Sequence, residues 1–185
     1  MCTHHVCVFC GSRTGNNPAH IAFARKLGQM LAQQNYGLVF GAGSVGLMNE
    51  VANAAIAHGG QTFGVIPKHL NKRERTHSQL SKLHITETMH ERKATMANLA
   101  DAFITLPGGF GTFEELLETI TWAQLKIHSK PVIVANVDGY YDPLIKFIDH
   151  AVATEFITPA NRHLFKTVST VQQCIQYLPT NGTSA

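Results

Sequence analysis

The strongest chemical signal in the chain is a glycine-rich run from Leu106 to Glu115 with the sequence LPGGFGTFEE. Three glycines between an expected strand and an expected helix let the backbone bend around a bound group, so that several amide N–H groups point at one anion. The start of the helix adds partial positive charge and unpaired N–H groups. We therefore interpret Pro107 to Thr112 as a phosphate-binding turn; the alternative is that its glycines only reverse the chain.

Glu115 stands three residues after Thr112, the spacing of a capping box in which the glutamate reaches back to the N-cap amide. We therefore expect the helix to begin after Thr112. A carboxylate over the first turn is repelled by the bound phosphate, so it should face the neutral sugar beside it. A group that acts on a glycosidic bond would stand there, although Glu114 and Glu118 compete for the role.

A second candidate helix, Met89–Ala100, precedes the glycine-rich run. One of its faces contains Met89, Arg92 or Lys93, Met96 and Leu99 or Ala100, so a cation interrupts an otherwise apolar face. Such a side chain often extends to solvent. A guanidinium held there can instead bind a phosphate or a base through two N–H donors. The residue types alone leave both interpretations open.

Residues Gly41 to Gly46 read GAGSVG and satisfy the G-x-G-x-x-G pattern of dinucleotide-binding loops. That pattern belongs to the first strand–helix turn and needs an acidic residue about twenty positions further on. Here the turn is the second one, and the next expected strand ends at Ile66-Pro67-Lys68. We interpret it as a second phosphate or sugar loop that includes Gly43, with an oxidoreductase as the alternative.

Cys7 and Cys10, close to His4 and His5, suggest a metal site at first sight. Residues three apart in a strand point to opposite faces, and no second pair of ligands follows. The other histidines lack the H-E-x-x-H spacing. We predict buried thiols and no metal.

Short β-branched or aromatic runs alternate with longer segments of helical period. The expected strands are Val6–Phe9, Leu38–Phe40, Thr62–Ile66, Phe103–Leu106 and Val132–Val137. The expected helices are Ala19–Gln34, Leu47–Ala57, Met89–Ala100, Phe113–Leu125 and Leu144–Ala153, the first capped by Asn17-Pro18. This alternation predicts an α/β fold: a Rossmann-like, doubly wound parallel sheet flanked by helices. Ligands bind at the carboxyl ends of such strands, which adds the loop with Ser12 to the candidate site.

The composition, with 185 residues of which 44% are hydrophobic and 15% charged, is that of one folded domain. We expect it to span residues 1–178, with a disordered tail at 179–185. The net charge of +3 comes from scattered Lys and Arg, which argues against nucleic-acid binding. Without a long apolar segment or a signal-like N-terminus, and with four cysteines expected as thiols, we predict a cytoplasmic protein that does not bind membranes.

Three stretches resemble one family: GSVGLM from Gly43, MHERK from Met89 and PGGxGTxxE from Pro107. Together they are similar to the LOG family of cytokinin riboside 5′-monophosphate phosphoribohydrolases, formerly labelled possible lysine decarboxylases. The similarity extends to Asp138-Gly139-Tyr140-Tyr141 and thus covers most of the chain. It implies a Rossmann-like homodimer that hydrolyses N6-substituted AMP to the free base and ribose 5-phosphate, often with activity on AMP.

The resemblance also implies roles for individual residues. Arg92 and Glu115 would be the catalytic pair. The substrate contacts would be Glu74, Lys93, Thr121 and the segment Gly109 to Glu115, which includes Phe110, Gly111, Thr112, Phe113 and Glu114, next to Gly108. The family commonly has three glycines where this chain has Gly41-Ala42-Gly43. Glycosidic cleavage passes through an oxocarbenium-like state that a carboxylate stabilises, so no cofactor is required.

Other functions fit parts of the same pattern. An AMP nucleosidase in purine salvage would use the same site, and a nucleotide-binding module would use it without catalysis. A pyridoxal-dependent decarboxylase would need a Schiff-base lysine, for which only Lys93 and Lys130 are candidates. For the expected dimer, the interface candidate is the helix Phe113–Leu125, with Leu116, Leu117, Ile120 and Trp122.

Overall fold

The computed structural model describes residues 2, 4–71 and 76–180. A seven-stranded, all-parallel sheet lies at its centre, in the order β4-β3-β2-β1-β5-β6-β7. The strands are β1 (His4–Phe9), β2 (Tyr36–Phe40), β3 (Thr62–Pro67), β4 (Lys82–Thr86), β5 (Ala102–Thr105), β6 (Val132–Ala135) and β7 (Lys166–Val168). The predicted parallel α/β sheet is confirmed, and the structure adds β4 and β7, which were not predicted, at the two edges.

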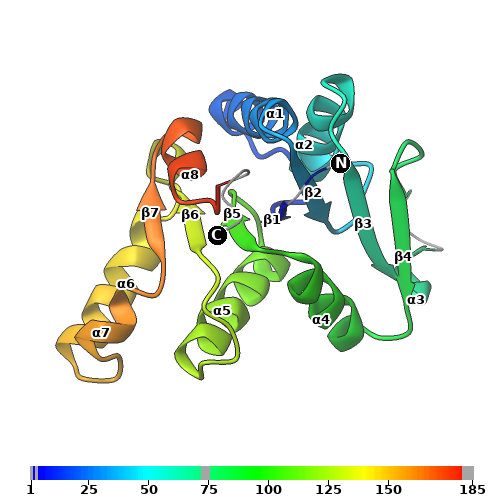
Figure 1. The fold of residues 1–185 in the computed structure, drawn as a ribbon. Helices are drawn as coiled ribbons and strands as arrows, with labels where there is room; N and C mark the ends of the chain where they lie inside the picture. The colour runs from blue at the N-terminus through cyan, green and yellow to red at the C-terminus, as the bar shows by residue number, and fades with distance from the viewer. Residues whose placement is uncertain (1, 3, 72–75, 181–185) are drawn as a thin grey trace.

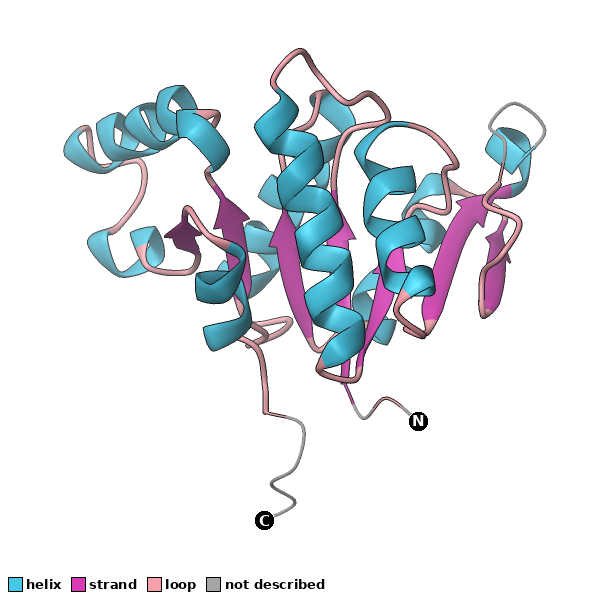
Figure 2. Ribbon diagram, turned by 90° about the horizontal axis from the view of Figure 1, so that it is seen from above, coloured by secondary structure: helices cyan, strands magenta, loops and turns pink. Residues whose placement is uncertain are grey.

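Helices cover both faces of the sheet, as Figures 1 and 2 show. Helices α1 (Pro18–Gln33), α2 (Gly46–Ala57) and α8 (Val171–Gln176) lie on one face, and α4 (Met89–Leu99), α5 (Phe110–Gln124) and α6 (Asp142–Ala153) on the other. The short elements are α3 (Lys68–Asn71), α7 (Pro159–Arg162) and a 3-10 turn at Val137–Gly139. The chain winds outward from β1 to β4 and then returns to β5, so the winding direction reverses between β1 and β5.

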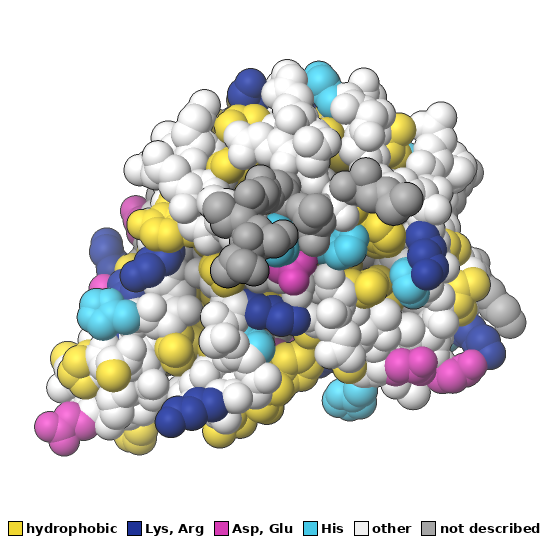
Figure 3. All heavy atoms as spheres, in the orientation of Figure 1, with side chains coloured by type: hydrophobic (Ala, Val, Ile, Leu, Met, Phe, Trp, Pro, Cys, Tyr) yellow, Lys and Arg dark blue, Asp and Glu magenta, His cyan; other side chains and the backbone are white. Residues whose placement is uncertain are grey.

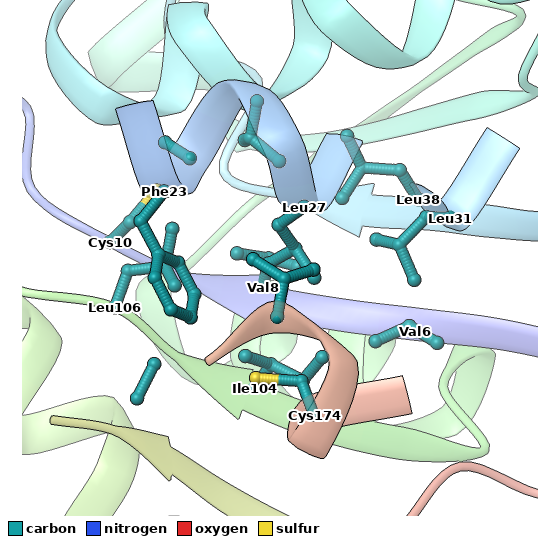
Figure 4. Packing of buried hydrophobic residues seen from close by; sticks show 14 of the residues in the cluster. Val6, Val8, Cys10, Phe23, Leu27, Leu31, Leu38, Ile104, Leu106 and Cys174 are labelled. Atoms are coloured by element: carbon teal, nitrogen blue, oxygen red, sulfur yellow. The ribbon is translucent and has the colours of Figure 1, made fainter. Parts of the chain in front are cut away.

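Strand β1 divides the core, because its side chains alternate between the two faces. Val6, Val8 and Cys10 pack toward α1 and α8, as Figure 4 shows, in the cluster that includes Phe23 and Cys174. The opposite cluster contains Cys7 and Phe9 with Met96 of α4 and Leu116 of α5. The prediction that the thiols of Cys7 and Cys10 are buried on opposite faces is confirmed.

The two predicted helix starts have different outcomes. Asn17 caps α1, since its side-chain oxygen accepts a hydrogen bond of 2.9 Å from Ala19 N, and Pro18 occupies the first turn, as predicted. The predicted capping box of α5 is wrong: the helix begins at Phe110 with Gly109 as N-cap and has no side-chain cap. Thr112 is instead buried inside the first turn, and the carboxylate of Glu115 bonds to another helix.

The exposed face of α5 agrees only in part with the predicted dimer interface. Leu116 is buried in the core and Ile120 packs against it, whereas Phe110, Leu117 and Leu125 are exposed. The homodimer stays a prediction, and Phe110 and Leu117 of α5 and Leu125 at its C-cap are exposed apolar side chains that such an interface could cover; Trp122, which the prediction also named, is half-buried.

The surface shows charges of both signs. On the face drawn in Figure 3, Lys and Arg side chains are separated from one another and interspersed with Asp and Glu. Within the described part of the chain, no helix combines the length and the apolar character that a bilayer crossing requires. Near the end of that part, the Tyr36 hydroxyl donates a hydrogen bond of 2.8 Å to the Pro179 carbonyl; residues 181–185 of the expected tail lie outside the described residues.

We predict that Gly28→Ala destabilises the fold, because α1 and α2 approach each other closely at this glycine. An added Cβ would lie 2.2 Å from the Val51 carbonyl oxygen, so the helices must move apart. Overpacking of this kind costs about 1–3 kcal/mol, more than the helix propensity that alanine gains. Urea denaturation should show this loss, while Lys26→Ala on the exposed side of α1 should leave the free energy of unfolding almost unchanged. Equal stability of Gly28→Ala and the wild type would contradict the prediction.

Candidate active site

A pocket of about 230 Å³ opens at the carboxyl ends of β1, β2, β3 and β5. It lies beside the reversal between β1 and β5, the place where doubly wound sheets bind their ligands. One side is formed by the loop after β1, with Gly11 and Ser12, and by the start of α5. The other side is formed by residues that follow β2 and β3.

The loops after β1, β2 and β5 are joined by backbone hydrogen bonds. Gly11 N donates to the Pro107 carbonyl at 3.0 Å, and Leu47 N donates to the Gly11 carbonyl at 3.0 Å. The Tyr140 hydroxyl donates to the Gly108 carbonyl from a fourth loop. A Cβ at Gly108 would lie 2.1 Å from Thr112 Oγ1, so only glycine allows this approach. The turn is therefore held in place before any ligand binds.

Two glycines of the same turn have a different environment. A Cβ built on Gly109 or Gly111 would meet no protein atom within 4 Å, and both residues line the pocket. Neither residue has a positive φ angle. The first N–H groups of a helix have no partner within that helix, which makes those at the start of α5 available to an anion. Internal packing does not require these two glycines, whereas close approach of a ligand to the backbone would.

Arg92 of α4 and Glu115 of α5 form a buried ion pair inside the pocket. Arg92 Nη1 donates to Glu115 Oε1 at 3.2 Å, and Arg92 Nε donates to the Val65 carbonyl of β3 at 3.1 Å. Each side chain is only 11% exposed. A Cβ at Gly41 would lie 2.3 Å from Arg92 Nη2, so the guanidinium packs directly on the backbone after β2. The residue types left open whether this cation extends to solvent or faces a bound group. In the structure Arg92 lines the pocket.

The environment of Glu115 raises its pKa. Burial is the main cause; the charge of Arg92 and its hydrogen bond oppose it, and the charge of Glu114 adds to it. Burial and the charge of Glu115 also raise the pKa of the thiols of Cys7 and Cys10 well above the usual value. Cys10 lines the pocket as a neutral group.

The polar groups of the pocket lie mainly at one end, which Val8, Phe9 and Phe110 also line, and the other end is apolar. Ser12 and the start of α5 line the end near β1 and β5, where backbone amides and a hydroxyl are available. Met48, Ile66 and Leu70 line the end near β2 and β3. Arg92 bonds to β3 and Glu115 comes from α5, so their ion pair bridges the two ends.

Half of the expected site residues line the pocket. Its lining includes Arg92, Glu115, Ser12, Gly109, Phe110, Gly111 and Thr112. Other expected contacts lie elsewhere in this chain: Gly108 packs beneath Thr112, Gly43 forms a bridge with Thr76, and Phe113 packs against the ring of Tyr141. Lys93 and Glu114 bind each other, Thr121 donates to the Leu117 carbonyl at 2.7 Å, and Glu74 lies outside the described residues.

The pocket confirms that the predicted loop after β2 lies at the site through Gly41, while several other lining residues were not predicted as contacts, among them Cys10, Met48, Ile66, Leu70 and Met96. Cys10 directly follows a strand that was predicted, so its position could have indicated it. Leu70 sits on a four-residue helix that has no sequence signal of its own. Within residues 4–71 and 76–180, no three His, Cys, Asp or Glu side chains lie together in a way that could hold a metal ion.

Solved structures of similar fold support the architecture. A molybdenum cofactor binding protein from Rippkaea orientalis matches with a TM-score of 0.72 and 22% sequence identity, over 95% of this chain and 95% of that chain. The Moco carrier protein of Chlamydomonas reinhardtii matches with a TM-score of 0.70 and 18% identity, over 94% of this chain and 93% of that one. At such low identity these matches show the fold alone.

Sequence comparison gives much closer relatives. A family model described as "Possible lysine decarboxylase" matches residues 23–178. A probable cytokinin riboside 5′-monophosphate phosphoribohydrolase of Oryza sativa subsp. japonica is 49% identical over 178 residues, which cover 94% of this chain and 78% of that protein. A cytokinin riboside 5′-monophosphate phosphoribohydrolase of Arabidopsis thaliana is 49% identical over 174 residues, covering 94% and 80%. The chain therefore belongs to the family of the cytokinin riboside 5′-monophosphate phosphoribohydrolases, whose family model carries the lysine decarboxylase description.

Proposed function

We propose that this protein hydrolyses the N-glycosidic bond of N6-substituted AMP and releases the free base and ribose 5-phosphate. The observation that carries the proposal is the buried Arg92–Glu115 pair, which faces a pocket whose polar end is the amide-rich start of α5. Relatives about half identical to this chain are named for this reaction. The same site would also serve an AMP nucleosidase. The apolar end of the pocket would then decide whether an N6-substituted base or plain adenine is preferred.

The polarity of the pocket orients the nucleotide. The phosphate lies against Ser12 and the first turn of α5, because unpaired amides and the helix dipole favour an anion there. The ribose then lies at the Arg92–Glu115 pair, and the base extends toward Met48, Ile66 and Leu70. The pocket volume of about 230 Å³ is below the range of about 300–1,000 Å³ that is usual for sites enclosing a whole small-molecule ligand. It suits part of a nucleotide, with the remainder of the ligand outside the enclosed space.

The chemistry follows from this orientation. As the bond between ribose and base lengthens, positive charge develops on the sugar, and the carboxylate of Glu115 stabilises it. Water adds its hydroxyl to the sugar carbon, and its proton accompanies the departing base. Arg92 keeps Glu115 in place and ionised through Nη1, and its remaining N–H donors are free to bind the substrate. Binding of the phosphate, remote from the breaking bond, supplies energy that a nucleoside lacks.

Glu115→Gln and Arg92→Ala should each lower kcat for base release by a factor on the order of 10²–10⁴, as expected for loss of a group that acts in the transition state. Release of base and ribose 5-phosphate would be measured from AMP, from N6-isopentenyl-AMP and from both nucleosides. The wild type should turn over nucleotides and leave nucleosides almost untouched. If the folded wild type binds both nucleotides but releases no base, the protein is a nucleotide-binding module and the proposal fails.

The kcat for AMP hydrolysis should decrease at acidic pH. Glu115 acts as a carboxylate, and because its pKa is raised, protonation inactivates the site at a higher pH than for an ordinary glutamate. The profile of kcat at saturating AMP reports this group in the complex, without the ionisation of the free substrate phosphate. We expect kcat to be constant toward neutral pH and to fall through the raised pKa of Glu115. A kcat that is independent of pH down to pH 4, about the usual glutamate value, would contradict this role.

Gly109→Ala and Gly111→Ala should weaken nucleotide binding without loss of stability. Their methyl groups meet no protein atom and project into open space beside the pocket lining. Alanine is a better helix former than glycine by about 1 kcal/mol. This gain applies to Gly111, which lies inside α5, and not to Gly109, which is the N-cap. We expect a higher KM for AMP and an unchanged or higher melting temperature. Gly108→Ala is the matched control, since its methyl group clashes with Thr112 and should lower the melting temperature. Unchanged KM in both variants would place the phosphate elsewhere.

A further inference from the structure

We propose that Tyr140 is a positioning residue for phosphate binding: its hydroxyl holds the Gly108 carbonyl away from the pocket and so keeps the N–H of Gly109 turned toward the ligand. The inference rests on the proposed function, because it takes the start of α5 as the phosphate site. Tyr140 belongs to the stretch 138–141, which is part of the family resemblance but has no role in the site described so far.

Four consecutive carbonyl groups of the glycine-rich turn accept hydrogen bonds from the protein. They are those of Leu106, Pro107, Gly108 and Gly109, and their donors are, in the same order, the Tyr141 hydroxyl, Gly11 N, the Tyr140 hydroxyl and Phe113 N. Each oxygen is therefore directed at a protein donor. What the turn offers to a ligand is its N–H groups, which suits an anion.

The N–H group that Tyr140 controls is that of Gly109. The peptide bond between Gly108 and Gly109 is trans, so its C=O and its N–H point in opposite directions. The oxygen bonds to Tyr140, which does not line the pocket, whereas Gly109 does line it. Within the described part of the chain, Gly109 N has no acceptor. This exposed donor at the N-cap of α5 is therefore available to a phosphate.

A peptide between two glycines needs such a restraint. Glycine populates positive and negative φ angles about equally, so this peptide can rotate by half a turn without a side-chain clash. Gly109 has a φ of −99°, and the rotation would bring it to a positive value that glycine tolerates. Packing does not oppose the rotation at Gly109, because a Cβ built there meets no protein atom within 4 Å. The rotated peptide would present its oxygen to the phosphate and repel it.

Tyr140 is itself held in place by the loop after β6. The chain turns before it through Asp138, whose φ is 50°. Asn17, the N-cap of α1, donates to the Asp138 carboxylate at 2.9 Å and so ties this loop to the start of α1. The ring of Tyr140 packs edge-to-face with His20 at 5.5 Å and with Tyr141 at 4.9 Å. A phenylalanine would keep these ring contacts and lose only the hydrogen bond to the turn.

The test compares AMP hydrolysis by the wild type, Tyr140→Phe and Tyr141→Phe. In Tyr140→Phe the KM for AMP should rise about 2- to 10-fold, the factor that corresponds to one hydrogen bond. The kcat should change less than KM, because the phosphate is bound alike in the substrate and in the transition state. The melting temperature should stay close to that of the wild type, since the lost hydroxyl belongs to a partly exposed side chain.

Tyr141→Phe is the matched control, because it removes the neighbouring hydroxyl from another carbonyl of the same turn. Its acceptor is Leu106, and the next residue is Pro107, so this peptide has no N–H to offer to a phosphate. Tyr141 is buried, and its loss of a hydrogen bond should lower the melting temperature and leave KM almost unchanged. An unchanged KM in folded Tyr140→Phe, or an equal rise of KM in both variants, would overturn the proposal.

A second measurement reads the peptide itself by NMR. The sequence contains two Gly-Gly peptides, Gly59–Gly60 and Gly108–Gly109. Protein labelled with ¹³C at the glycine carbonyls and ¹⁵N at the glycine amides should therefore give two carbonyl–amide cross-peaks, of which Gly109→Ala removes one. Tyr140→Phe should shift the Gly108–Gly109 peak in the free protein and leave the Gly59–Gly60 peak in place. An unshifted Gly108–Gly109 peak would contradict the role of Tyr140.

Titration of the same peak with ribose 5-phosphate separates this inference from the hydrolase assignment. In the wild type the Gly109 amide should shift and reach saturation, and Tyr140→Phe should need about 2- to 10-fold more ribose 5-phosphate. A wild-type Gly109 amide that does not respond while AMP is hydrolysed, or equal affinities of the two proteins, would refute the inference alone. A wild type that responds as expected but releases no base from AMP would count against the proposed function alone.

Discussion

The site depends on one buried ion pair between helices that are separated in the chain by a strand and a loop. Arg92 and Glu115 meet only because α4 and α5 lie side by side on one face of the sheet and begin or end near the same strand ends. Burying two charges costs free energy, and the attraction between them repays it only when geometry and further hydrogen bonds are good. The Val65 carbonyl and the bare backbone of Gly41 supply those conditions for Arg92. The pair therefore meets the conditions under which two charges can be held in a largely buried site.

The order of the strands determines how a nucleotide can lie in the pocket. From β5 to β3, the ends of the strands supply first the amides and the hydroxyl of Ser12, then the ion pair, then the apolar side chains of Met48, Ile66 and Leu70. A phosphate, a sugar and a base are joined in that same sequence. Tight packing of Gly108 against Thr112 keeps the polar end rigid, while the space beside Gly109 and Gly111 stays open. Within one turn, Gly108 therefore allows the tight packing of the backbone, and Gly109 and Gly111 leave room for a ligand beside it.

Residue spacing predicted the structure least well where the same residue fits two different local arrangements. The spacing of Thr112 and Glu115 fits a capping box, yet α5 starts two residues before Thr112, and the carboxylate of Glu115 bonds to Arg92 of another helix. Strands β4 and β7 were missed because both lie at edges: β4 is largely exposed, and β7 has only three residues, so neither carries a strong apolar run. Lys93 shows the same limit, since its neighbours in sequence do not reveal that two carboxylates of α5 surround its ammonium group.

The sequence alone was sufficient for the parallel α/β sheet, the core strands and helices, the burial of the two N-terminal thiols and the glycine-rich turn, because these depend on periodicity and on residues adjacent in the chain. The family motifs also singled out Arg92 and Glu115. Only the tertiary structure decided that Arg92 faces the pocket while Lys93 faces Glu114 and Glu118, that Gly108 is packed while Gly109 is open, and which residues form the apolar end. These features arise from contacts between segments far apart in the chain, and such contacts leave no periodic trace in the sequence.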